Sequence, residues 1–404
     1  MTTQTIASAE PRTVVSTTSR LTSLDGLRGL ASVVVVLHHL YLVAAPVLTR
    51  QGGSGFNSAY WWLSNTPLKL LTAGTEAVLV FFVLSGLVVT LPALNRASFS
   101  WTGFFTGRIV RLYLPVWVSL AIGTGLVWFL PRDGSMVTQG AWIDTSNATS
   151  TDWQTLLSEA SLARASYDIN NVLWSLRWEM AFSVLLPLFV AIAILIRRYW
   201  AIALGFSVAL TIWGSLIGID ALRYLPVFFI GTLMAVRLES ITTWARQLRY
   251  KPGARARDIT LVTVALLLIV IGWLTRPFVP SDTIGYVVLA QLPVVGATGL
   301  VLAAIAVPSL RRALDMAAFQ WLGRISFSLY LVHIPILATL SFVLGDGNWA
   351  IVALLTIPLS LLSAWAFHRT IERPVHRLAR KTSKGVAAKV AHFQTLSRAS
   401  EQSG

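Results

Sequence analysis

Residues 23–46 read SLDGLRGLASVVVVLHHLYLVAAP, an apolar stretch long enough to cross a lipid bilayer. The stretch nevertheless contains Arg28 and His39, which are eleven residues apart. This spacing comes to about 20° past three full helical turns, so both side chains lie on one face. Asp25 lies within about 40° of that face, whereas His38 points about 100° away from His39. Ionisable side chains are costly inside a membrane helix and mark functional pathways, so this face is a candidate site.

The composition is typical of a polytopic membrane protein. Of 404 residues, 55% are hydrophobic and 12% are charged, and the mean hydropathy is +0.68. A soluble domain has roughly 25% charged residues. The net charge of +15 could suggest a nucleic-acid partner, but basic cytoplasmic loops explain it better in such an apolar chain. The chain has no cysteine, and we find no metal-ligand spacing, so we expect neither a metal nor a permanently bound cofactor.

The apolar runs predict an all-α protein with about ten transmembrane helices and both termini in the cytoplasm. The expected helices are 24–46, 74–92, 112–130, 174–196, 200–218, 222–236, 259–274, 284–306, 325–344 and 349–369. The sixth is short and could be tilted or partly re-entrant. With cytoplasmic termini, 24 basic residues lie inside and 7 outside, and Arg28 lies within the first helix. The opposite orientation would violate the positive-inside rule at nearly every loop.

The expected domains follow from these helices. Residues 1–22 form a flexible cytoplasmic N-tail, 23–376 form the transmembrane domain, and 377–404 form a basic cytoplasmic C-tail, flexible from 379. No cleavable signal peptide is expected, so the first helix directs insertion. We expect a multi-pass protein of a bacterial plasma (inner) membrane.

Residues 131–173 form the longest expected extracytoplasmic segment. Its stretch 151–164, TDWQTLLSEASLAR, has amphipathic helical spacing. The apolar side would carry Trp153, Leu156, Leu157 and Ala160. The segment is either a lid on the outer surface or a solvated connection.

Glu179 is predicted at a depth similar to that of His39, just inside an aromatic edge formed by Trp174 and Trp178. A low dielectric favours the neutral imidazole that a general base must be, and a nearby carboxylate would orient that imidazole. Two structural roles remain open. His39 could simply pack between helices, and Glu179 could pair with Arg177 or with another helix.

Three further motifs contain ionisable residues. Arg108 and Arg111, in GRIVRLYLP, lie one turn apart at the expected inner rim. They either follow the positive-inside rule or bind phosphates of a cytoplasmic ligand. His333, in GRISFSLYLVHIPIL, either packs beside Pro335 or takes part in chemistry, and Glu372, in ERP, is expected to end the last helix.

Together these segments resemble the membrane-bound acyltransferase-3 family. LDGLRGLASVVVVLHH is similar to its first helix, in which His follows Arg after eleven residues. AVLVFFVLSG, GRIVRLYLP, WSLRWEMAFSVLLP, LGRISFSLYLVHIP and IERP resemble its later motifs in the right order, over nearly all of 23–376. Two departures are Thr75-Glu76, where an Asp or Asn is frequent, and Phe327, where Tyr is usual.

The resemblance implies an integral membrane O-acyltransferase with acyl-CoA, usually acetyl-CoA, as donor substrate. The acyl group would pass from the cytoplasm to a hydroxyl of an extracytoplasmic sugar, glycolipid or glycan of the cell envelope. The phosphates of the donor would dock at Arg108 and Arg111, and its pantetheine arm would run along the face of Asp25 and Arg28 to His39.

The resemblance also implies roles for the remaining candidates. Arg28, held by Asp25, would contact the donor or polarise its thioester. His39 would deprotonate the acceptor or carry the acyl group, two routes that sequence does not separate. The acceptor side would include Glu179, Trp178, Tyr330 and His333.

Two other readings belong to different classes. A transporter or flippase of an envelope glycolipid could use the same polar face as a translocation path. Inverted repeats would favour it, and none is evident. A sensor or scaffold derived from the enzyme family is the other, and the intact Arg28 and His39 argue against it.

Overall fold

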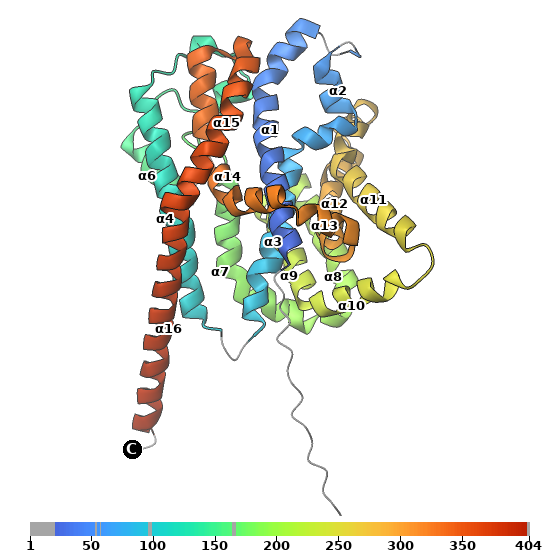
Figure 1. Ribbon diagram of the computed structural model, residues 1–404, viewed down its shortest axis with the longest axis vertical. Helices are drawn as coiled ribbons and strands as arrows, with labels where there is room; N and C mark the ends of the chain where they lie inside the picture. The colour runs from blue at the N-terminus through green and yellow to red at the C-terminus, as the bar shows by residue number, and fades with distance from the viewer. Residues whose placement is uncertain (1–20, 53–54, 57, 96–98, 164–166, 402–404) are drawn as a thin grey trace, which may run out of the picture.

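The computed structural model describes residues 21–52, 55–56, 58–95, 99–163 and 167–401, and this part of the chain is helical with no strand. The expected N-tail falls almost entirely outside it. Nine helices of the described residues are long and apolar enough to cross a bilayer, or ten if a pair bent by 67° counts as one span. The prediction of about ten helices is confirmed (Figure 1).

The long helices are α1 (Thr22–Gly52), α3 (Gly74–Ala93), α4 (Trp101–Phe129), α7 (Leu173–Leu195), α8 (Trp200–Leu216), α9 (Asp220–Val236), α11 (Ala254–Thr275), α12 (Ile284–Ala306), α14 (Ala317–Leu344), α15 (Trp349–Phe367) and α16 (Arg373–Glu401). Shorter α-helices are α2 (Ala59–Asn65), α5 (Trp142–Thr145), α6 (Trp153–Ala160), α10 (Leu238–Arg249) and α13 (Pro308–Leu314). The 3₁₀ turns are η1 (Pro67–Thr72), η2 (Gly134–Met136), η3 (Arg197–Tyr199), η4 (Arg276–Phe278) and η5 (Asp346–Asn348), and η6 (His368–Glu372) is a π-helix.

Helix α1 lies at the centre of the bundle, against α3, α12, α14 and α15 (Figure 1). Glycines permit its closest approach to α14. A Cβ on Gly29 would lie 2.5 Å from the backbone nitrogen of Gly323, so no other residue fits without moving a helix. Gly86 of α3 and Gly231 of α9 face each other in the same way. Small residues at such crossings let two backbones pack directly, as is usual between membrane helices.

Helix α4 begins earlier than the sequence indicated. We expected a span from 112, with Arg108 and Arg111 at its rim, but α4 starts at Trp101. The hydroxyl of Ser100 accepts a hydrogen bond from Gly103 N and caps this end. Both arginines therefore lie inside a continuous helix, because their charges face a polar interior that hydropathy alone does not reveal.

Residues 131–173, which we call the outer segment after their expected position, are packed onto the helices where the structure describes them. Asn170, fully buried, donates to Ser119 of α4 and to the carbonyl of Leu331 of α14. Arg132 donates to the carbonyl of Ala148 and to Thr339. These contacts join the segment to two helices, so the interpretation as a solvated connection is wrong.

Helix α6 forms where the amphipathic spacing predicted a helix, and Leu156 and Ala160 of the expected apolar side pack on the core, but the other two residues of that side do not. Trp153 and Leu157 are 67% and 69% exposed, whereas Glu159 is 1% exposed. The Glu159 carboxylate accepts hydrogen bonds from the backbone N–H groups of Asp168, Ile169 and Asn170. The hydrogen bonds of its carboxylate keep Glu159 in the interior at the expense of Trp153 and Leu157. Sequence periodicity does not predict these bonds.

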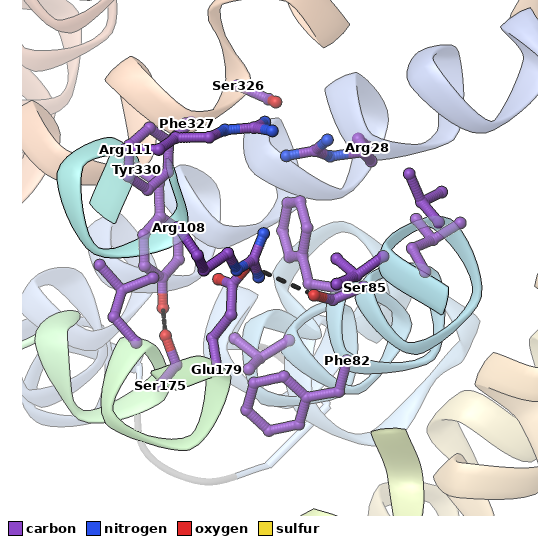
Figure 2. Close-up of a pocket in the computed structure, with 16 residues that line it drawn as sticks. Arg28, Phe82, Ser85, Arg108, Arg111, Ser175, Glu179, Ser326, Phe327 and Tyr330 are labelled. Carbon is purple, nitrogen blue, oxygen red and sulfur yellow. Dashed lines mark hydrogen bonds and ion pairs between the residues drawn. The ribbon is translucent and has the colours of Figure 1, made fainter. Parts of the chain in front are cut away.

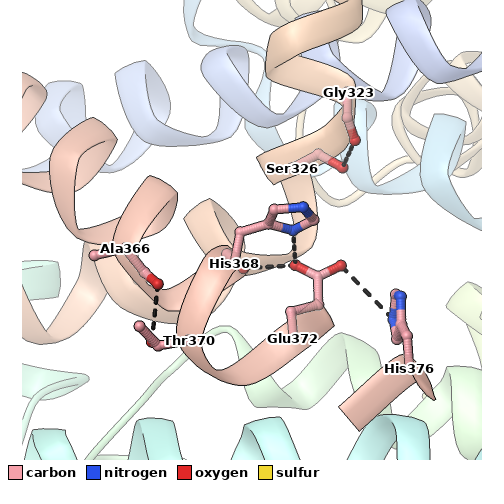
Figure 3. Close-up of polar contacts among 8 residues, drawn as sticks. Gly323, Ser326, Ala366, His368, Thr370, Glu372 and His376 are labelled. Carbon is pink, nitrogen blue, oxygen red and sulfur yellow. Dashed lines mark hydrogen bonds and ion pairs between the residues drawn. The ribbon is translucent and has the colours of Figure 1, made fainter. Parts of the chain in front are cut away.

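The C-terminal region differs from expectation in two ways. Glu372 does not end a helix, because α15 continues through the π-helical turn η6 into α16. Its carboxylate accepts hydrogen bonds from Ser328 at 2.5 Å and from His368 Nδ1 at 3.0 Å, and His376 Nε2 lies 3.7 Å away (Figure 3). The second difference is that residues 379–401, expected as a flexible tail, are helical, and the part of α16 around Ser383 and Ala387 packs against α4 (Figure 1).

The α3–α9 crossing gives a direct test of the fold. We expect Gly231→Leu to lower the thermal unfolding midpoint strongly, because the side chain would meet the backbone of α3 and overpacking costs about 1–3 kcal/mol or more. The matched control is Gly205→Leu on α8, where a Cβ meets nothing within 4 Å. Unfolding of the two variants in detergent, followed by circular dichroism, checks this. Equal midpoints would contradict the close crossing.

Candidate active site

A polar pocket of about 100 Å³ lies between α1, α3, α4, α7 and α14 (Figure 2). Arg28, Arg108 and Arg111 line it together with Glu179 and Ser85. Figure 2 shows the guanidinium groups of Arg28 and Arg111 on one side of the pocket and Arg108 beside Glu179. Tyr330 lines it as well, so five of the predicted site residues meet in one place. Three guanidinium groups against one carboxylate leave the pocket with an excess of positive charge.

Arg108 and Glu179 form the ion pair of this pocket. Arg108 Nη2 lies 2.5 Å from Glu179 Oε1, and its Nε donates to Ser183 at 2.9 Å. Arg108 is 8% exposed, so this pair is largely removed from water. Glu179 also accepts a hydrogen bond from Ser85. Of the two partners that the sequence left open for Glu179, the structure therefore shows the arginine of another helix and not Arg177. The guanidinium carbon of Arg177 lies 5.0 Å from the centroid of the Trp178 ring.

Tyr330 connects the pocket with a second group of polar residues. It lines the pocket, its hydroxyl lies 2.7 Å from Ser175 Oγ, and its ring centroid lies 6.0 Å from that of His333. His333 Nε2 lies 3.2 Å from His39 Nδ1, so α14 brings a second histidine directly against the first. Both histidines are buried, at 0% and 8% exposure.

The carbonyl contacts of these two histidines define where their protons reside. His39 Nδ1 lies 2.9 Å from the Val35 carbonyl, and His333 Nδ1 lies 2.9 Å from the Leu329 carbonyl. A carbonyl can only accept, so we assign the hydrogen to Nδ1 in each ring. The single Nδ1–H of His39 is then shared between the Val35 carbonyl and the lone pair on Nε2 of neutral His333, and Nε2 of neutral His39 carries a lone pair as well. This tautomer has the basic nitrogen that proton abstraction requires.

Aromatic and histidine rings surround the pair. Trp142, from the outer segment, lies with its ring centroid 5.0 Å from that of His39. His38 turns away, as its helical position predicted, and its Nδ1 lies 2.8 Å from the Thr72 carbonyl. A Cβ on Gly74 would overlap the His38 ring, so glycine is needed to make room for it. No spacing in the sequence pointed to Trp142, because it reaches His39 only through the tertiary fold.

The remaining predicted residues lie outside the pocket wall. Trp178 is buried, with its ring centroid 5.7 Å from that of Tyr224 on α9. Asp25 lies in the first turn of α1, where its backbone faces Gly323 of α14. Its role in holding Arg28 stays a prediction. No cluster of metal-ligating residues is found within the described part of the chain.

A buried lysine lies beside this region, on η1. Lys69 is fully buried, with its Nζ 3.8 Å from the centroid of the Trp273 ring and 4.8 Å from that of Tyr41. Trp273 donates to Glu76 at 2.8 Å, so Glu76 belongs to this cluster. Burial lowers the pKa of Lys69 to about 8, while Glu76 opposes the change. The cluster ties η1 and α3 to α11 through cation–π contacts.

The lowered pKa of Lys69 predicts a pH-dependent stability. The unfolded lysine keeps a pKa near 10.5, so unfolding takes up a proton between about pH 8 and 10.5. The free energy of unfolding therefore increases as the pH rises through that range. We expect Lys69→Met to lack this gain. Thermal unfolding from pH 7.5 to 10 measures it, with the exposed Lys384→Met as control. Parallel pH profiles for wild type and Lys69→Met would refute the assignment.

Comparison with known proteins identifies the class of this site. The family model described as an acyltransferase domain, Acyl_transf_3, matches residues 21–369. The chain therefore belongs to the acyltransferase-3 family and is a membrane-embedded, acyl-transferring enzyme. All the helices that line the arginine pocket, and both histidines, lie within the matched range.

Two curated relatives are similar along almost the whole chain. The O-acetyltransferase PaAT-1 of Phomopsis amygdali is 25% identical over 94% of this chain and 86% of its own length. The acyltransferase MdmB of Streptomyces mycarofaciens is 26% identical over 89% of this chain and 92% of its own length. No solved structure matches the chain. Both names denote transferases, so neither relative supports the transporter reading.

Proposed function

We propose that this enzyme transfers an acyl group, most simply acetyl, from acyl-CoA to a hydroxyl of a sugar-containing acceptor on the opposite side of the membrane. The observation that carries the proposal is the His39–His333 hydrogen bond, which leaves a lone pair on His39 Nε2. The base lies eleven residues along α1 from Arg28 of the arginine pocket, a separation that suits a donor and an acceptor approaching from different sides.

The arginine pocket is the proposed donor site. Phosphates of CoA carry charge that Arg28 and Arg111 can bind by charge-assisted hydrogen bonds, whereas Arg108 is engaged by Glu179. The positive-inside distribution of basic residues favours a cytoplasmic position for this side. From Arg28 to His39, α1 rises about 16 Å. The thin arm of the donor would cover this distance past Tyr330, which lies between the pocket and the histidines.

His39 is the proposed general base. The acceptor O–H gives its proton to His39 Nε2 as the oxygen attacks the thioester carbonyl carbon. The tetrahedral intermediate then loses the CoA thiolate, which takes the proton from His39, so one C–O bond forms as one C–S bond breaks. His333 stabilises the transient imidazolium by accepting from His39 Nδ1.

The same lone pair permits a covalent route. His39 Nε2 would attack the thioester, release the CoA thiolate and pass the acyl group to the acceptor in a second step. Mass spectrometry of His39-containing peptides after mixing with acetyl-CoA alone distinguishes the routes. An added acetyl group in the absence of acceptor indicates the covalent route, and its absence under turnover conditions indicates direct transfer.

The outer side of His39 is the proposed acceptor site. Trp142 covers the imidazole from the packed outer segment, and a flat indole provides an apolar surface for one face of a sugar ring. An extracytoplasmic sugar, glycolipid or glycan of the cell envelope is the acceptor class that fits best. Mass spectrometry of glycans and lipids from wild type and a deletion strain would identify the acceptor as the molecule that lacks one acyl group in the deletion strain.

Histidine variants test the assignment of the base. In liposomes containing purified protein, we expect His39→Ala to lower kcat by about 10²–10⁴-fold, the range for general acid–base catalysis. His333→Ala should lower kcat by about tenfold with little change in KM, and His333→Gln should retain more activity because its amide oxygen can still accept. His392→Ala, exposed on α16, is the control. Full activity of His39→Ala would refute the assignment.

Arginine variants test the donor site. We expect Arg111→Ala and Arg28→Ala each to raise KM for acyl-CoA by about tenfold, the loss expected for one charge-assisted contact. Arg108→Ala should in addition lower the unfolding midpoint, because it leaves Glu179 without its partner. Initial rates at varied donor concentration measure this, with the exposed Arg312→Ala on α13 as control. Unchanged donor dependence in all three variants would exclude a phosphate site.

A further inference from the structure

Helix α10 lies across the ends of neighbouring helices instead of continuing α9. The chain turns by 67° at Arg237, between Val236 and Leu238, and α10 then packs against α9 and α12. In Figure 1 this helix runs along the lower edge of the bundle beneath α8 and α9. A helix in this position, with apolar and basic sides, is typical of the membrane–water interface.

A cavity of about 370 Å³ lies under this bend, between α8, α9, α10 and α12. Its wall is almost wholly apolar, with Leu233 and Met234 of α9 facing Leu302 of α12. Its size falls in the range of small-molecule sites. An apolar opening of this size among membrane helices is unfavourable for water, so a hydrocarbon chain is the appropriate occupant.

Positive charge borders the cavity on the side of α10. Arg237 lines the cavity, with its guanidinium carbon 6.0 Å from the centroid of the Trp200 ring. Residues 237–258 contain six basic and two acidic residues. Trp200 and Trp244, both exposed and both lining the cavity, are residue types that prefer the level of lipid headgroups. The cavity therefore combines an apolar interior with a cationic rim flanked by tryptophans.

We propose that this cavity binds an anionic glycerophospholipid. One acyl chain occupies the space between α8, α9 and α12, and the phosphate lies at Arg237. Anionic headgroups are attracted by basic pockets at helix ends, whereas a zwitterionic lipid with the same chains lacks the net charge. The inference is independent of the transfer reaction, because the cavity shares no lining residue with the arginine pocket.

Lipid binding to the purified full-length protein tests the proposal. After delipidation in detergent, native mass spectrometry would compare phosphatidylglycerol with phosphatidylcholine of identical dioleoyl chains. We expect wild type to bind phosphatidylglycerol about fivefold more tightly than phosphatidylcholine. This is the gain in affinity that one basic residue at a membrane surface provides. Equal binding of the two lipids by wild type would overturn the proposal.

Variants separate the headgroup contact from the chain site. Arg237→Gln should bind both lipids equally, and Leu302→Trp, which fills the cavity, should lose the tightly bound lipid of either kind. Ser240→Trp, at an exposed position on the rim, serves the same purpose without requiring space in the core. Arg380→Gln on α16 should behave as wild type. An unchanged preference for phosphatidylglycerol in Arg237→Gln, or unchanged binding in both tryptophan variants, would overturn the assignment.

Discussion

The hydrogen bond between His39 and His333 depends on the close crossing of α1 and α14. The two ring nitrogens are 3.2 Å apart, which requires the helix backbones to approach where Gly29 meets Gly323. The same crossing brings Arg28 of α1 and Tyr330 of α14 to one pocket. The absence of side chains at these two glycines is therefore one steric constraint that sets the position of both histidines and of the two pocket residues.

The charge of the pocket is balanced only in part. Two membrane helices contribute Arg108 and Glu179, and pairing removes the large cost of leaving either charge alone in a low dielectric. Arg28 and Arg111 add positive charge that the pocket itself does not neutralise with a second carboxylate. A bound anion would offset this excess charge, so the same arrangement would provide affinity for the phosphorylated donor that we propose.

Helical periodicity predicted the parts of the structure that lie on one helix. The number of long helices, the shared face of Arg28 and His39, and the separate direction of His38 all follow from hydropathy and from 3.6 residues per turn. Glu179 was expected at the depth of His39, but it lies in the pocket lined by Arg28, where it pairs with Arg108, 71 residues away along the chain. Contacts between helices depend on which faces pack, and one sequence does not specify that.

The errors share a physical cause. The start of α4 was placed too late because Arg108 and Arg111 lower the hydropathy of a turn that faces a polar interior. The buried face of α6 was only partly right, because Glu159 is buried with its carboxylate satisfied by three backbone N–H groups, whereas Trp153 and Leu157 are exposed. In each case a charged residue is buried together with its hydrogen-bond partners. Hydropathy averaged along the sequence treats such a residue as exposed.

In the proposed reaction, the packed outer segment would determine how an acceptor meets His39. Asn170 and Arg132 fix this segment to α4 and α14, and Trp142 then rests against the imidazole. Both histidines are almost fully buried, so the acceptor hydroxyl that we propose would need a change at this cover, such as a displacement of Trp142, to reach Nε2 of His39. Exclusion of water by the same side chain would protect a thioester at His39 from hydrolysis until an acceptor arrives. The cover over the base is therefore as relevant to the outcome of transfer as the base itself.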